Sequence, residues 1–126
     1  VKALESARGH LMMFDSLSGA AQSAMLDATV KELPGAGERL KRFVKAWGAG
    51  DAESVGAEMN RVAQASPEVA EALVARRNAR WADWVAARMA QPGTVFVAVG
   101  AGHLAGKGSV QSLLGDKGLK VERVAY

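Results

Sequence analysis

The chain contains no cysteine, few aromatic residues and no long hydrophobic segment. The absence of cysteine excludes disulfide bonds, a thiolate nucleophile and a cysteine-ligated zinc site. The longest strongly apolar run, residues 95–99, is far shorter than the about 20 residues of a membrane-spanning helix, so no membrane segment is predicted. Sixteen Lys and Arg against thirteen Asp and Glu leave a net charge of +3, which argues against a nucleic-acid partner.

The composition that remains is that of an ordinary globular protein. Of the 126 residues, 49% are hydrophobic and 23% are charged, so a single folded domain over residues 1–126 is expected. From about residue 6 to residue 91 the pattern is helical. Helices are predicted to begin after capping side chains, which are Ser6, Ser18, Asp51, Ser66 and, further on, Ser109.

Two of the expected helices have an apolar face at helical spacing. These faces consist of Leu26, Val30 and Leu33 in one helix and of Leu40, Phe43, Val44 and Trp47 in the next. An apolar face of this kind normally packs against a hydrophobic core. We therefore expect both faces, together with the cluster at residues 12–14 and the three tryptophans, to lie inside the protein.

The pattern changes from helical to strand-like at Thr94. Residues 94–99 are apolar on both faces and rich in valine, which predicts a buried strand of a parallel or mixed sheet. Residues 119–124 alternate polar and apolar and predict an edge strand, and Val1–Leu4 could end a third. The expected fold class is therefore α/β: a helix-rich chain with a strand–helix–strand unit at residues 94–126, part of a larger mixed sheet. Because the apolar strand has too few neighbours, we expect self-association or pairing with an N-terminal half outside this chain.

A glycine-rich loop with a histidine follows the apolar strand. Gly100, Gly102 and His103 lie where open α/β sheets bind ligands, so the imidazole is a candidate metal ligand or base. The alternative is a tight turn whose histidine bonds the backbone. The letters also match a dinucleotide fingerprint, but the next helix begins too late, at Ser109, to place a phosphate at its N-terminus.

Arg77 lies at the centre of an apolar helical stripe that includes Trp81. Burying an unpaired guanidinium is costly, so a carboxylate, a cluster of carbonyls or an anionic ligand should meet it, and Glu5 is a possible partner. Two interpretations stay open for Arg77: a structural ion pair, or a site residue. Glu5 is likewise either a site residue or a helix-start acid. His10 is expected on the surface.

These motifs together resemble the TraB/GumN family, which includes the Tiki-type proteins. The resemblance rests on residues 95–106 around Gly100-Ala101-Gly102-His103, on Leu4-Glu5 and on Arg77-Asn78 with Trp81, in the family's order and across essentially the whole chain. The family pattern has two Gly-x-x-His motifs, a glutamate and an arginine. Gly100–His103 matches the second motif, and the first is absent, so the resemblance predicts the C-terminal portion of a longer family member.

The resemblance implies a metal-dependent hydrolase of peptidase type with half of its site in this chain. Glu5 and His103 would bind a divalent ion such as Mn, Co or Zn, with Arg77 as a third catalytic residue and Gly100 and Gly102 contacting the ligand. A peptide or small polar molecule would be the substrate, and the fragment alone would be inactive. Bacterial relatives are often exported or membrane-attached, which implies an extracytoplasmic location.

Two rival functions remain open at this stage. The same pocket could bind a peptide or saccharide without turnover, or the loop could belong to a nucleotide-binding α/β domain. The distance from His103 to Glu5 and Arg77 is the deciding feature, because the site proposed from the sequence requires all three side chains to converge.

Overall fold

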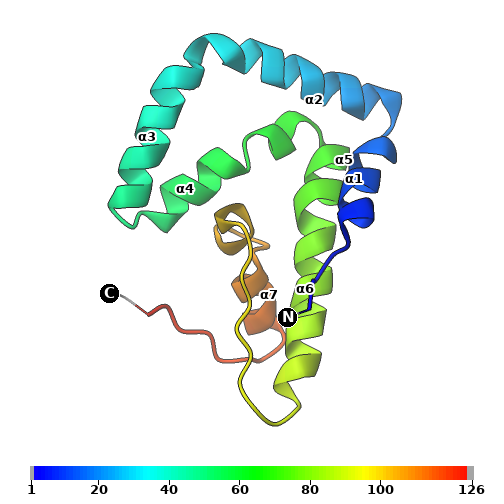
Figure 1. The fold of residues 1–126 in the computed structure, drawn as a ribbon, viewed down its shortest axis with the longest axis vertical. Helices are drawn as coiled ribbons and strands as arrows, with labels where there is room; N and C mark the ends of the chain where they lie inside the picture. Colours follow the sequence, from blue (N-terminus) through cyan, green and yellow to red (C-terminus); the bar gives the residue numbers. More distant parts are fainter. Residues whose placement is uncertain (1, 125–126) are drawn as a thin grey trace.

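The computed structural model describes residues 2–124, and these residues form a chain of helices. In Figure 1, α2 crosses the top, α3 descends and α4 returns toward the long α5–α6 segment, beside which α7 packs. The α-helices are α1 (Ala7–Asp15), α2 (Gly19–Glu32), α3 (Ala36–Gly48), α4 (Ala52–Met59), α5 (Pro67–Ala70), α6 (Arg76–Met89) and α7 (Val110–Asp116). Short 3₁₀ turns are η1 (Leu33–Gly35), η2 (Val62–Ala65) and η4 (Ala101–Leu104), and η3 (Glu71–Ala75) is a π-helical turn.

The predicted capping residues begin the helices as expected. The side chains of Ser6, Ser18, Asp51, Ser66 and Ser109 each accept a hydrogen bond from a backbone N–H in the first turn of α1, α2, α4, α5 and α7. The helix predicted to begin after Ser66 is present and continues to Met89, with the π-helical turn inside it. A local signal thus fixes where each of these helices begins.

The expected α/β fold is wrong, because residues 2–124 form no β-strand. Residues 94–100 and 119–124 lie outside any helix, yet neither segment pairs with another. A strand exists only through hydrogen bonds to a neighbouring strand, so β-branched composition alone cannot make one. The N-terminal strand expected at residues 1–4 is also absent from the described residues, which exclude Val1. The domain as described is all-α.

Two small clusters of buried apolar side chains hold the helices together. One joins Leu17 and Ala21 to Val69 at the corner of α1, α2 and α5. The other joins Trp81 and Ala82 of α6 to α7, and its partners are Val110, Leu113 and Leu114 with Leu4 and Val99. This second cluster fixes the N-terminal segment, α6 and the segment before the glycine-rich loop against one another.

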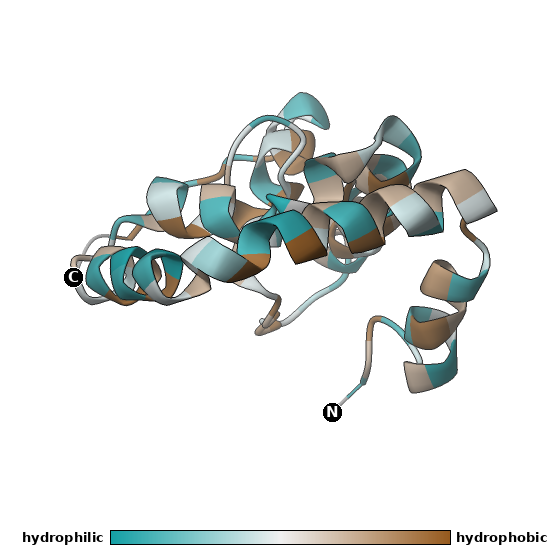
Figure 2. Cartoon of the chain, turned by 90° about the horizontal axis from the view of Figure 1, so that it is seen from above, coloured by the Kyte–Doolittle hydropathy of each residue, from teal (hydrophilic) through white to brown (hydrophobic). Residues whose placement is uncertain are grey.

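The two apolar helix faces do not lie inside, which corrects the expectation from periodicity. Leu26 and Leu33 are each 62% exposed, and Trp47 of α3 is 64% exposed. Figure 2 shows brown residues on the outer side of α2, which crosses the front of that view. Periodicity identifies an apolar face but not whether a neighbour covers it. Met12 is also exposed, whereas Trp81 is buried.

None of the helices in residues 2–124 is both long enough and apolar enough to span a bilayer.

Candidate functional site

A widened turn in the α5–α6 segment precedes the residues of the candidate site. The π-helical turn Glu71–Ala75 ends immediately before α6, and the Leu73 carbonyl in it accepts a hydrogen bond from Nη1 of Arg77 at 3.0 Å. Single π turns inside α-helices often lie next to functional residues. The geometry of this turn therefore fixes one end of the Arg77 guanidinium.

Glu5 holds the other side of the same guanidinium. Nε of Arg77 donates to both carboxylate oxygens of Glu5 at 3.0 and 3.1 Å, and Nη2 donates to Oε2 at 2.9 Å. Nη2 of Arg80 donates to Oε1 of Glu5 at 3.1 Å. The side chains of Arg77 and Glu5 are 13% and 15% exposed. The partner that the sequence suggested for Arg77 is therefore confirmed, and Arg80 joins the pair.

The Glu5 carboxylate is surrounded by positive charge. Burial alone would raise its pKa, but the hydrogen bonds and charge of Arg77, followed by the charges of Arg80 and His10, lower the pKa below 4.5. Nδ1 of His10 lies 3.8 Å from Oε2 of Glu5. Two arginines against one carboxylate leave this cluster with an excess positive charge, which suits an anionic group or developing negative charge.

The glycine-rich loop packs against α4 and forms the turn η4. The N–H of His103 donates to the Gly100 carbonyl at 2.9 Å, and Nδ2 of Asn60 donates to the Gly102 carbonyl at 2.7 Å. A Cβ at Gly102 would lie 2.8 Å from Oδ1 of Asn60 and 3.0 Å from Cβ of Met59. Gly102 therefore permits the close approach of the loop to α4, while Gly100 is exposed beside the imidazole.

Asn78 determines which nitrogen of His103 carries the proton. Asn78 is 1% exposed, and its Nδ2 donates to the Gly108 carbonyl at 2.7 Å. This bond orients the amide so that Oδ1 faces Nδ1 of His103 at 2.6 Å. Because Oδ1 can only accept, Nδ1 must carry the hydrogen, and the Nε2 lone pair of the neutral ring is left open.

His103 is kept neutral by its surroundings. Burial lowers its pKa below 6.5, the charge of Arg77 lowers it further, and Glu5 opposes this shift. The Trp81 ring contacts both groups: its centroid lies 4.6 Å from that of the imidazole and 4.8 Å from Cζ of Arg77. The site thus combines a neutral imidazole with a nearby guanidinium.

A cavity of about 340 Å³ lies between α1, where His10 lines it, and α4, η2, the α5–α6 segment and the glycine-rich loop. Arg77, Trp81, His103, Gly100 and Gly102 all line it. Glu5 is linked to it through the ion pair with Arg77. Arg77 and His103 therefore share this cavity, whereas Glu5 adjoins it through Arg77 and itself lines the neighbouring hollow beside residues 95–100.

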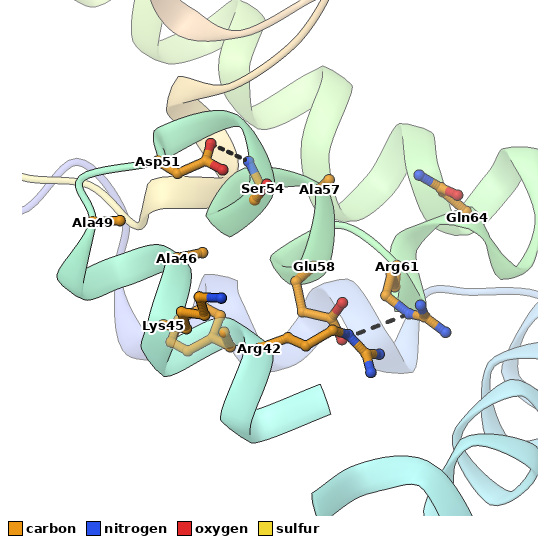
Figure 3. A pocket seen from close by; sticks show the side chains of 11 residues that line it. Arg42, Lys45, Ala46, Ala49, Asp51, Ser54, Ala57, Glu58, Arg61 and Gln64 are labelled. Carbon is orange, nitrogen blue, oxygen red and sulfur yellow. Dashed lines mark hydrogen bonds and ion pairs between the residues drawn. The ribbon is translucent and has the colours of Figure 1, made fainter. Parts of the chain in front are cut away.

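A larger hollow of about 630 Å³ lies away from these residues, between α3 and α4. Figure 3 shows its charged lining, in which Glu58 faces Arg61 across a distance of 3.8 Å and Asp51 caps α4 through Ser54. Its cations are largely offset by acids, and it contains no histidine. We therefore place the candidate site in the smaller cavity, where the motif residues meet.

The possible metal-binding donors within the described residues are few. No three His, Asp or Glu side chains gather within residues 2–124 in a way that could hold an ion. Both oxygens of Glu5 already accept hydrogen bonds from arginine. A hydrolytic metal site commonly needs about three protein ligands, and this chain offers Nε2 of His103.

The profile of the TraB/PrgY/gumN family matches residues 1–123. The chain belongs to the TraB/PrgY/gumN family. No curated protein and no solved structure matches it. The match confirms the resemblance inferred from the three motifs, and it covers Glu5, Arg77 and the loop with His103.

Asn78 belongs to the candidate site of this TraB/PrgY/gumN family member, but the sequence alone did not predict its role. Asn78 follows Arg77 in the Arg-Asn motif, but the motif does not reveal its role, because a buried amide has no distinctive spacing. The available signal was its place next to Arg77 in a helix otherwise apolar on that side, where a buried amide must find hydrogen-bond partners.

Proposed function

We propose that this chain contributes the base of a hydrolytic site that acts on a peptide or small polar substrate. The observation that carries the proposal is the hydrogen-bond chain from the Gly108 carbonyl through Asn78 to Nδ1 of His103. It leaves Nε2 as the acceptor that can take a proton from water or another nucleophile. The lowered pKa of His103 keeps this nitrogen unprotonated at neutral pH.

Arg77 and Glu5 have complementary parts in this proposal. Arg77 supplies positive charge where a substrate carbonyl would gain negative charge. Glu5 and Leu73 do not occupy all of its N–H donors, so the guanidinium can still donate to a substrate. Glu5 orients the guanidinium. A carboxylate whose pKa is lowered by two arginines is a poor base, so we assign proton transfer to His103 and not to Glu5.

The test is hydrolysis of a panel of fluorogenic peptides and p-nitrophenyl esters by the whole chain, measured with and without added Mn²⁺. We expect His103→Ala to lower kcat about 100-fold or more, which is the usual size of a general-base contribution. Lys107→Ala, an exposed change in the same loop, is the matched control and should leave the rate unchanged. The rate of the unaltered chain should fall as the pH drops through the pKa of His103, which lies below its usual value of 6.5, because the imidazole then becomes protonated.

The Mn²⁺ arm separates a metal-dependent site from one that works without a metal. His103 is the residue through which this chain would join a metal centre completed by donors from elsewhere. If turnover requires Mn²⁺ and vanishes in His103→Ala, the imidazole has that role. If neither condition gives turnover above that of His103→Ala, the catalytic proposal is wrong.

A non-catalytic binding site is the second candidate, favoured by the saturation of Glu5. Both carboxylate oxygens of Glu5 accept hydrogen bonds from arginines. Glu5 is therefore not available as the acid that would work together with His103. The site would then bind a peptide or saccharide, and calorimetry would show saturable binding of such a ligand without turnover. Arg77→Ala should weaken that binding, while the neighbouring Arg76→Ala should not.

A further inference from the structure

The cavity lined by His103 and Arg77 has apolar walls that the proposed chemistry does not use. Besides Trp81, its apolar lining comes from the end of α4, from η2 and from the π-helical turn, as Met59, Ala63, Leu73 and Val74. Met59 is 54% exposed, and Leu73 and Val74 are half-buried, so part of this lining is open to solvent. Apolar walls beside a few polar groups that fix orientation are typical of a small-molecule pocket.

The polar groups of the lining already have partners or tasks. Nδ2 of Asn60 is bonded to a carbonyl of the glycine-rich loop at 2.7 Å, and Nδ1 of His10 lies 3.8 Å from a carboxylate oxygen of Glu5. In the proposed reaction, His103 and Arg77 act on the carbonyl that is attacked. The surface left to contact the rest of a substrate is therefore mainly apolar.

The charge of the cavity favours a neutral side chain over a charged one. Among the described residues that line it, Arg77 carries a positive charge and no Asp or Glu is present. A basic side chain of a ligand would meet this like charge without a counter-ion, and an acidic one would compete with Glu5 for the guanidinium. A polar neutral side chain would lose its hydrogen bonds to water against Met59 and Val74. An apolar side chain has none of these costs, because contact with the walls removes both apolar surfaces from water.

The volume of the cavity sets the size of that side chain. At about 340 Å³ the cavity is near the lower end of the range of about 300–1,000 Å³ for ligand pockets. Ala63 is 7% exposed and forms part of the wall, so its small side chain keeps this space open. We infer that the cavity takes a substrate side chain of the size of valine, leucine or methionine, next to the carbonyl that is hydrolysed. The inference rests on the proposed function, but it is measured as binding without turnover.

NMR titration of the whole chain with two uncharged probes of similar shape tests the inference. The probes are N-acetyl-leucine amide and N-acetyl-asparagine amide, and their binding is followed at the indole N–H of Trp81 and the imidazole of His103, which both line the cavity. We expect the leucine probe to bind at least about tenfold more tightly, which is the low end of the gain from burying a leucine side chain. N-acetyl-lysine amide and N-acetyl-aspartate amide should both bind more weakly than the leucine probe.

Two substitutions on the apolar walls have close matches elsewhere in the chain. Met59→Ala shortens the last residue of α4, and Met89→Ala does the same at the last residue of α6, which is 60% exposed and outside the cavity. Val74→Thr places a hydroxyl in the cavity, and Val30→Thr places one on the exposed face of α2. We expect each cavity variant to weaken binding of the leucine probe about fourfold, since a buried methylene group is worth roughly that factor. The two controls should bind it as the unaltered chain does, and circular dichroism would verify that all four variants are folded.

Three outcomes would overturn the inference. The first is the absence of a saturable shift at Trp81 and His103 with the leucine probe, and the second is equal or tighter binding of the asparagine or a charged probe. The third is unchanged binding of the leucine probe in both cavity variants. Turnover of glycine, leucine and asparagine substrates at equal rates would refute this inference and leave the proposed function standing. Selective binding of the leucine probe by a chain without turnover would refute the catalytic proposal and support the apolar side-chain site.

Discussion

Replacing Glu5 by glutamine would test how far the ion pair with Arg77 stabilises the fold. Removing one partner of a buried pair costs about 3–5 kcal/mol, because the other charge is left without compensation. Here the two side chains are 13% and 15% exposed, and the glutamine carbonyl still accepts one hydrogen bond. We therefore expect Glu5→Gln to lower the free energy of unfolding by about 2–3 kcal/mol, or Tm by roughly 6–15 °C for a domain of this size.

The assay is thermal and urea unfolding followed by circular dichroism. Glu71→Gln is the matched control, because it also removes one carboxylate from an ion pair, that with Arg76 at 3.7 Å. Those side chains are 54% and 65% exposed, so the control should change stability by less than about 0.5 kcal/mol. Equal losses of unfolding free energy in the two variants would refute the argument that burial makes the Glu5–Arg77 pair contribute more to stability than an exposed pair.

The pH dependence gives an independent check of the same pair. The pKa of Glu5 is lower in the folded chain than its usual value of 4.5, so the folded state favours the ionised carboxylate. The stability it contributes is complete above the unfolded-state pKa and is lost as the pH falls through the lowered folded-state pKa. The difference between wild type and Glu5→Gln should therefore be constant at neutral pH and shrink in that acidic window.

Three shorter predictions concern the loop and its partners. NMR titration of the His103 imidazole should give a midpoint below 6.5, and a midpoint above 6.5 would contradict the contacts described here. Lowering the pH from 6.5 through the pKa of the folded chain should favour unfolding, because the unfolded chain binds the proton more readily. Asn78→Asp should raise the pKa of His103 by placing a carboxylate at Nδ1. It should also destabilise the fold, because an acceptor then faces the Gly108 carbonyl. An unchanged titration would argue against the contact between residue 78 and Nδ1 of His103. Gly102→Ala should cost about 1–3 kcal/mol in urea unfolding by forcing the loop away from Asn60, whereas Gly115→Ala, with open space at its Cβ, should not destabilise.

Local signals in the sequence predicted local structure well. A capping side chain bonds within its own first turn, so Ser6, Ser18 and Ser109 fix helix starts without help from the rest of the fold. The pairing of Arg77 with Glu5 was predictable for a different reason: a guanidinium on an apolar stripe must find an acid, and few acids follow an apolar segment.

Expectations that needed a distant neighbour failed. Residues 94–99 were expected to be a strand, yet strand formation requires a second strand that residues 2–124 do not supply. The apolar faces containing Leu26 and Trp47 were expected inside, yet periodicity says nothing of what lies opposite the face. The role of Asn78 could not be derived either, because its two partners, Gly108 and His103, come from a loop whose position depends on packing against α4 and α7.

The same arrangement explains why the imidazole and the ion pair belong to one site. Trp81 contacts the guanidinium of Arg77 and the ring of His103. Packing against the same indole ring fixes the position of the positive charge relative to the imidazole. Burial of the imidazole, followed by the nearby charge of Arg77, lowers the pKa of His103, and the Asn78 amide fixes the proton on Nδ1. Glu5 in turn orients the Arg77 guanidinium, and both of its oxygens are occupied by N–H donors of arginine. The neutral base and the fixed cation depend on all of these contacts, so loss of any one should alter the titration of His103 as well as the stability of the fold.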